Sequence, residues 1–99
     1  MGRMQMHSEG YRSLTKKIMA VADSVCDGRL VLCHEGGYNP ATVPFFGLAV
    51  VEQLSGIKTE VVDPFYELMA ALGGQELQPH QNIAIEQAEV LLTNLKKSN

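Results

Sequence analysis

The chain lacks the features that would place it in a membrane or on a nucleic acid. Eleven acidic residues outnumber eight basic ones, and the net charge of -3 offers no basic face for a nucleic acid. The most apolar stretch, Val43 to Val51, has about half the length of a membrane span. The first residues, Met1 to His7, lack the apolar core of a secretion signal. We therefore expect a cytoplasmic protein with neither a membrane nor a nucleic acid among its partners.

Cysteine is also scarce. The two cysteines, Cys26 and Cys33, match neither a CxxC redox pair nor a zinc-binding framework. We expect two free, buried thiols in a reducing cytoplasm.

Length and composition indicate one globular unit. Ninety-nine residues make one small domain, and a hydrophobic share of 45% is too high for a disordered chain. The sequence contains no repeat, low-complexity segment or dividing linker, so we treat residues 1–99 as a single, partial domain.

Hydrophobic periodicity and turn residues predict four helices. Prolines fit the first turn of a helix, and glycines fit the left-handed position after its last turn. The second helix is apolar on nearly every side, so we expect it to be buried. Pro44 allows the regular part of this helix to begin only there. The expected starts are Ser8, Asn39-Pro40, Asp63-Pro64 and Pro79, and the expected stops are Asp27-Gly28, Gly56 and Gly73-Gly74.

A short apolar run followed by two glycines is the most informative segment. Arg29–His34 has the aliphatic content of a buried strand without alternation, as in a parallel sheet. Gly36 and Gly37 allow a sharp turn at its carboxyl end, where α/β sheets place their ligands. Tyr38 follows with a hydroxyl that can donate a hydrogen bond. These residues alone also allow an ordinary turn followed by a packed tyrosine.

The predicted strand has too few neighbours within this chain. Only residues 57–62 form a second, weak candidate strand. Buried backbone groups without partners cost roughly 1–3 kcal/mol each, so a lone core strand is not stable. We expect the chain to be a portion of a larger α/β domain.

Five motifs occur in an order that resembles a known family. The series resembles the carboxyl-terminal part of class II histone deacetylases and of their bacterial relatives, the acetylpolyamine amidohydrolases and acetoin-utilisation proteins. It extends from about Gly2 to about Gly56, and beyond that the likeness rests on the helix pattern. The motifs are Gly10-Tyr11-Arg12-Ser13-Leu14-Thr15, Gly28-Arg29-Leu30-Val31-Leu32, Glu35-Gly36-Gly37-Tyr38-Asn39, Val43-Pro44-Phe45, and Ala49-Val50-Val51-Glu52-Gln53-Leu54-Ser55-Gly56.

The resemblance implies an α/β fold of the arginase/deacetylase type, with a parallel sheet. This chain would be its carboxyl-terminal portion, mostly α with one core strand near 29–34. It also implies hydrolysis of acetyl-lysine or a related acyl-amide, in which zinc polarises the carbonyl and a histidine pair activates water. Tyr38 matches the catalytic tyrosine whose hydroxyl donates to the developing oxyanion. Gly36 and Gly37 would line the acyl channel and bind the substrate.

The zinc-binding motifs of that family do not occur in this sequence. The 99 residues contain no Asp-x-His run and no adjacent histidine pair. His34 and Glu35 are neighbours, but a zinc site needs three or four converging ligands. We therefore expect no metal or other cofactor in this chain, and we expect it to be inactive alone.

Two hypotheses about its state follow. In the first, the chain is the inactive portion of a deacetylase, either as a truncated product or as one half of a split enzyme. A separate polypeptide would then supply the zinc-binding part along the open strand edge. In the second, the chain is a small, mostly helical interaction module without catalysis. The apolar faces of the second and last helices would then pack in a homo-oligomer or against a partner.

Overall fold

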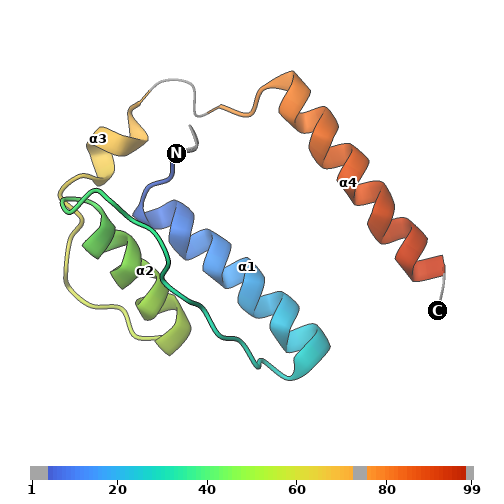
Figure 1. Ribbon diagram of the computed structural model, residues 1–99, viewed down its shortest axis with the longest axis horizontal. Coiled ribbons are helices and arrows are strands. Elements are labelled where there is room, and N and C mark those ends of the chain that lie inside the picture. Colours follow the sequence, from blue (N-terminus) through green and yellow to red (C-terminus); the bar gives the residue numbers. More distant parts are fainter. Residues whose placement is uncertain (1–4, 73–75, 98–99) are drawn as a thin grey trace.

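The computed structural model describes residues 5–72 and 76–97, and these are helical or irregular, with no β-strand among them. The prediction of four helices is confirmed. Gly73-Gly74, expected to close the third helix, lies outside the described residues. The helices are α1 (Ser8–Cys26), α2 (Val43–Ser55), α3 (Tyr66–Ala70) and α4 (Pro79–Lys97) (Figure 1).

The ends of α1 show how local chemistry sets its length. Its cap is His7, whose Nδ1 accepts a hydrogen bond from the Gly10 N–H at 3.1 Å. The expectation that Ser8 caps the helix was wrong, because Ser8 is already the first helical residue and is buried. At the other end Asp27 and Gly28 both have positive φ, at 53° and 72°, so the predicted stop is confirmed.

The second helix begins after a turn. The Asn39 carbonyl accepts hydrogen bonds from the N–H groups of Thr42 and Val43, and α2 therefore starts at Val43 rather than at Asn39-Pro40. It ends where Gly56 takes the left-handed conformation with φ 71°. The expectation that this helix is buried on all sides was wrong. Val51 is 59% exposed because, among the described residues, α1 is the one helix that packs extensively against α2.

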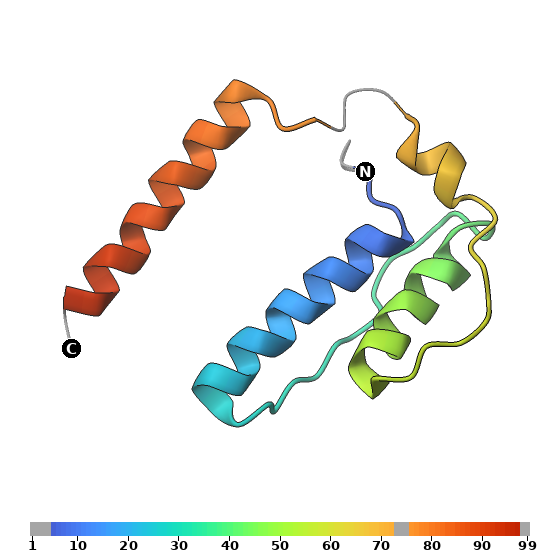
Figure 2. The ribbon, with the colours of Figure 1, turned by 180° about the vertical axis from the view of Figure 1, so that it is seen from behind.

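Helices α1 and α2 form the packed part of the molecule. They run in the same direction, and the extended chain between them returns along their length (Figures 1 and 2). The rings of Tyr11 and Phe46 stack across the interface, with centroids 5.0 Å apart. Ala22 and Ala49 are the buried apolar side chains of the described residues, so the core is small and lies between these two helices.

The predicted core strand near 29–34 is not a strand in the structure. Residues 29–39 are extended, but no backbone hydrogen bond joins 30–38 to another described residue. Val31 is 85% exposed and Cys33 is also exposed, so neither the strand nor the burial of Cys33 is present. The physical reason is that the described residues offer no pairing partner, since an extended segment becomes a strand only by pairing its backbone with another.

The segment after α2 returns beside that helix and ends in the short helix α3. Residues 57–62, the weak second strand candidate, are irregular. Phe65 packs near Phe45, with ring centroids 6.1 Å apart, and Tyr66 meets His7 edge-to-face at 5.1 Å. These contacts hold α3 close to the first turns of α1 and α2.

Helix α4 begins at Pro79, as predicted, and lies apart from the other helices in both views (Figures 1 and 2). Residues 79–94 are all exposed, including the large apolar side chains of Ile83, Leu91 and Leu92. No helix among the described residues has both the length and the apolar character needed to span a bilayer. The helical content is compatible with a portion of a deacetylase-type fold, although the described residues contain no parallel sheet.

Candidate functional site

The glycine turn lies at an apolar groove. A cavity of about 510 Å³ lies between α1, α2 and the extended segment that joins them. The segment contributes His34, Gly36 and Gly37, and the stacked rings of Tyr11 and Phe46 form part of the opposite wall. The structure therefore places both predicted substrate-binding glycines at this apolar groove.

Gly37 occupies a position that other residues cannot take without strain. Its φ is 122°, a region that side chains with a Cβ rarely adopt. A Cβ at this position would lie 3.0 Å from Val43 Cγ1 and 3.1 Å from His34 Nε2. At Gly36, in contrast, the nearest atom to such a Cβ is Tyr38 Cε2 at 4.0 Å. The two glycines are thus unequal, because only Gly37 is required by both space and backbone conformation.

Tyr38 follows Gly37 but is not part of the groove wall. Its side chain is 81% exposed, so its hydroxyl is open to a molecule that approaches from outside. Little side-chain packing fixes its direction. The backbone of the turn sets the point and the direction from which this side chain extends, and its χ1 and χ2 set the rest.

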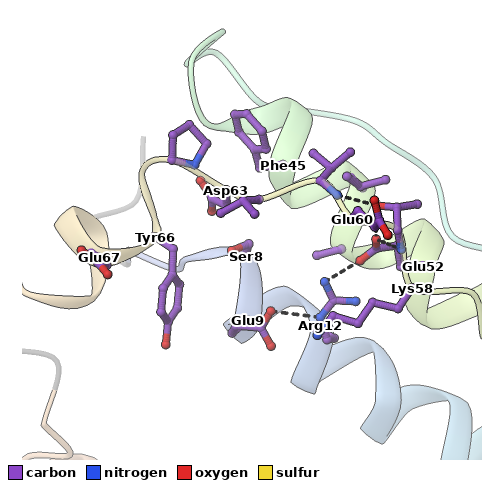
Figure 3. A pocket seen from close by; sticks show the side chains of 16 residues that line it. Ser8, Glu9, Arg12, Phe45, Glu52, Lys58, Glu60, Asp63, Tyr66 and Glu67 are labelled. Atoms are coloured by element: carbon purple, nitrogen blue, oxygen red, sulfur yellow. Dashed lines mark hydrogen bonds and ion pairs between the residues drawn. The ribbon is translucent and has the colours of Figure 1, made fainter.

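A second cavity lies on the other side of the α1–α2 pair. It has a volume of about 620 Å³ and is lined by charged residues from α1, α2 and the segment 58–67 (Figure 3). At its wall Arg12 Nη2 donates to Glu52 Oε2 at 2.6 Å, while Arg12 Nε donates to Glu9 Oε1 at 3.1 Å. The other oxygen of Glu52 accepts from the Thr59 N–H at 2.6 Å and from the Thr59 hydroxyl. One carboxylate thus joins α1, α2 and the following segment.

These contacts change the acidity of both charged partners. Hydrogen bonds from the Thr59 hydroxyl, the Thr59 N–H and Arg12 lower the pKa of Glu52 from 4.5 to about 2. The hydrogen bond to Glu52 in turn raises the pKa of Arg12. Glu52 is 6% exposed, and its carboxylate is held in the charged form because each oxygen has a donor.

The sequence interpretation did not identify this network. One signal was available, because Glu52 is the only charged residue in the helix that the structure places at Val43–Ser55. A single charge in an apolar helix indicates a partner, although its identity, 40 positions away, cannot be read from spacing. Asp63 lines the same cavity. Its Oδ1 accepts from the Phe65 N–H at 2.9 Å, and its Oδ2 is buried without a hydrogen-bond partner in the described part of the chain.

The described residues do not fit a zinc ion. Within 5–72 and 76–97, no three side chains of the ligand-forming types His, Cys, Asp and Glu converge on one point. His34 and Glu35 are both exposed on the same segment, and no third such side chain joins them. No step of a reaction can therefore be assigned to a metal held by these residues.

Comparison with known proteins identifies relatives. The histone deacetylase domain matches residues 1–54. A histone deacetylase-like amidohydrolase of Pseudomonas aeruginosa is 46% identical over 69 residues, which cover 70% of this chain and 18% of the relative. A probable deacetylase of Archaeoglobus fulgidus is 28% identical over 60 residues, which cover 60% of this chain and 17% of the relative. The chain thus spans less than a fifth of these curated relatives, and the matched family domain includes the glycine turn.

Proposed function

Because this chain belongs to the histone deacetylase domain family, we propose that it forms the tyrosine-bearing part of a histone deacetylase-like amidohydrolase. The reaction is hydrolysis of acetyl-lysine or a related acyl-amide. One observation carries the proposal: the turn that precedes Tyr38 lies within the matched domain, at an apolar groove, in a conformation that requires glycine at Gly37.

In the proposed reaction Tyr38 is an oxyanion donor. Water adds to the amide carbonyl carbon, and the carbonyl oxygen gains negative charge. The C–N bond then breaks as the nitrogen takes up the two protons of the water, which gives a carboxylate and an ammonium group. The Tyr38 hydroxyl donates a hydrogen bond to that oxygen as its charge grows. Such a donor stabilises the transition state more than the substrate. Gly36 leaves room for the acyl group because it has no side chain, and Gly37 brings the backbone of the turn to the same groove.

The resemblance to zinc-dependent relatives implies a metal, and the described residues do not hold one. We infer that the zinc ligands and the groups that activate water lie in polypeptide outside these 99 residues. That polypeptide is either another part of the same protein or a separate chain. On this proposal the 99-residue chain alone does not hydrolyse an acetyl-lysine substrate, with or without added zinc.

The test places this chain in a complete enzyme. The stretch of the P. aeruginosa relative that this chain matches is replaced by this chain, and the chimera is assayed on an acetyl-lysine peptide. We expect Tyr38→Phe to lower kcat by about 100- to 1000-fold, the usual effect of losing one oxyanion donor. Tyr66→Phe is the matched control, since it removes a tyrosine hydroxyl from the other cavity. Equal activity of Tyr38→Phe and the parent chimera would refute the role of Tyr38.

A second function, that of a non-catalytic interaction module, is favoured by a different observation. The apolar side chains of α4 are exposed, and Ala22 and Ala49 are the buried apolar residues of the described chain. Light scattering on the purified chain separates the two functions. A stable homo-oligomer that unfolds cooperatively, together with an active Tyr38→Phe chimera, would favour the module.

The cysteines support a proposal about location. Cys26 and Cys33 are both free, and the Cys26 thiol donates to the Arg29 carbonyl at 3.2 Å. Free thiols are typical of reducing compartments, so we propose that the protein works in the cytoplasm.

A further inference from the structure

We propose that His34 is a positioning residue for Tyr38, through the contact of its ring with Gly37. This inference rests on the proposed role of Tyr38 as the oxyanion donor. His34 attracts notice in the sequence as a possible metal ligand, yet the described residues give it no metal-binding partners. Its ring instead lies beside Gly37, the residue before Tyr38.

Two side chains pack on the Cβ side of Gly37. His34 Nε2 and Val43 Cγ1 are 3.1 Å and 3.0 Å from the place where a Cβ of residue 37 would lie. Both side chains therefore occupy the space beside Gly37. All three residues also line the same groove. One residue of the extended segment and one residue of the helix thus fill the space on the Cβ side of Gly37.

The Val43 side of this contact is anchored. Val43 is the first residue of α2, and its N–H donates to the Asn39 carbonyl at 3.1 Å. From the extended segment the contact comes from the His34 side chain, because residues 30–38 have no backbone hydrogen bonds to described residues. Without the imidazole ring, Gly37 would be supported by Val43 alone. Its φ, 122° in this structure, would then be free to change.

The consequence for Tyr38 is geometric. A catalytic donor must be held within about 0.5 Å of its productive position, which requires support from surrounding groups. The Tyr38 side chain is 81% exposed and receives little such support from its own packing. The φ and ψ of the turn fix the direction of its Cα–Cβ bond, from which the hydroxyl is reached through χ1 and χ2. In this way His34 acts on Tyr38 without touching the substrate.

The first experiment measures the contact on the 99-residue chain itself. Heteronuclear NOE values of the Gly37 and Tyr38 amides report motion of the turn on the ps–ns timescale. We expect His34→Ala to lower both values and His34→Gln, which keeps a long planar side chain, to restore most of the loss. His80→Ala, which removes an exposed histidine on α4, is the control and leaves them unchanged. Unchanged values in His34→Ala would overturn the inference.

The second experiment is a double-mutant cycle in the chimera described above. We expect His34→Ala to lower kcat about tenfold with KM within twofold, and to have no further effect in a Tyr38→Phe background. An equal loss in both backgrounds, or no loss in either, would overturn the positioning role. If Tyr38→Phe alone leaves kcat unchanged, the proposed function fails instead. The amide measurements on the isolated chain then still decide whether His34 holds the turn.

Discussion

At the scale of single residues, the two neighbouring glycines provide a matched pair. We expect Gly37→Ala to lower the free energy of unfolding by about 1–3 kcal/mol, because alanine must adopt a φ of 122° and meet Val43 and His34. Gly36→Ala should change it by less than about 0.5 kcal/mol, because the Cβ meets no atom closer than 4.0 Å. Urea titration of the chain, followed by circular dichroism, measures both. Equal losses would show that Gly37 is not specially constrained.

Glu52 predicts a dependence of stability on pH. Because its pKa falls from 4.5 to about 2 on folding, the charged carboxylate stabilises the fold above pH 4.5. That contribution is lost as the pH falls from 4.5 towards 2, where the folded form also takes up a proton. We expect the thermal midpoint of the helical signal to fall over this window, and to fall less in Glu52→Gln.

The control for this prediction is Glu60→Gln. Glu60 lines the same cavity but is exposed, so its removal should leave the acid-dependent fall intact. If Glu52→Gln and the parent chain lose the same amount between pH 4.5 and pH 2, other carboxylates cause the loss.

The candidate site shows which residue roles a sequence can indicate. The glycine turn could be found because glycine takes backbone conformations that other residues rarely adopt. The catalytic role of Tyr38 rests on the ordered motifs around it and stays a prediction. The role of Glu52 was missed because its partner Arg12 lies 40 positions away. The place of His34 beside Gly37 was missed for a related reason. A packing contact depends on the path of the backbone, which residue types alone do not define.

At the scale of secondary structure, the end of α1 offers a way to stabilise the chain. Asp27 takes the left-handed conformation with φ 53°, and its negative charge lies at the negative end of the helix dipole. Its ion pair with Arg29 at 3.5 Å is exposed and contributes little. We expect Asp27→Gly to raise the free energy of unfolding by about 1 kcal/mol in a urea titration.

Asp27→Asn separates the two causes of this effect. It removes the charge but keeps a side chain, so we expect a smaller gain than from Asp27→Gly. A loss of stability in Asp27→Gly would mean that the entropy of glycine in the unfolded chain outweighs both terms.

The sequence predicted the helices better than the conformation of residues 29–34, which were expected to form a strand. The start at Pro79 and the stops at Gly28 and Gly56 follow from the local chemistry of a few residues. The expected starts at Asn39-Pro40 and Asp63-Pro64 were wrong by two or three residues, because a turn precedes α2 at Val43 and α3 at Tyr66. The segment 29–34 has the composition of a strand, yet it remains extended and unpaired. A helix satisfies its own backbone hydrogen bonds, whereas a strand depends on a neighbour that these described residues do not provide.

At the scale of the whole molecule, the packed part is small. Among the described residues, the extensive contacts between helices are those of α1 with α2. Most of the large apolar side chains are exposed. Surfaces of this kind mark interaction sites more often than free surface. This supports the proposal that further polypeptide completes the fold, and it agrees with a match that spans less than a fifth of each relative.

Helix α4 allows the extent of the packed part to be measured. Since residues 79–94 are all exposed, their removal takes away no buried contact from α1 or α2. We expect a chain that ends at Gln78 to keep the thermal midpoint of the full chain within about 2 °C, with a helical signal reduced in proportion to the residues lost. An isolated helix of this length is marginal in water, so α4 should also lose its amide protection first in hydrogen exchange. A lower midpoint in the shortened chain would instead mean that α4 stabilises the α1–α2 pair in solution, and its apolar side chains would then be buried within the molecule or between copies of it.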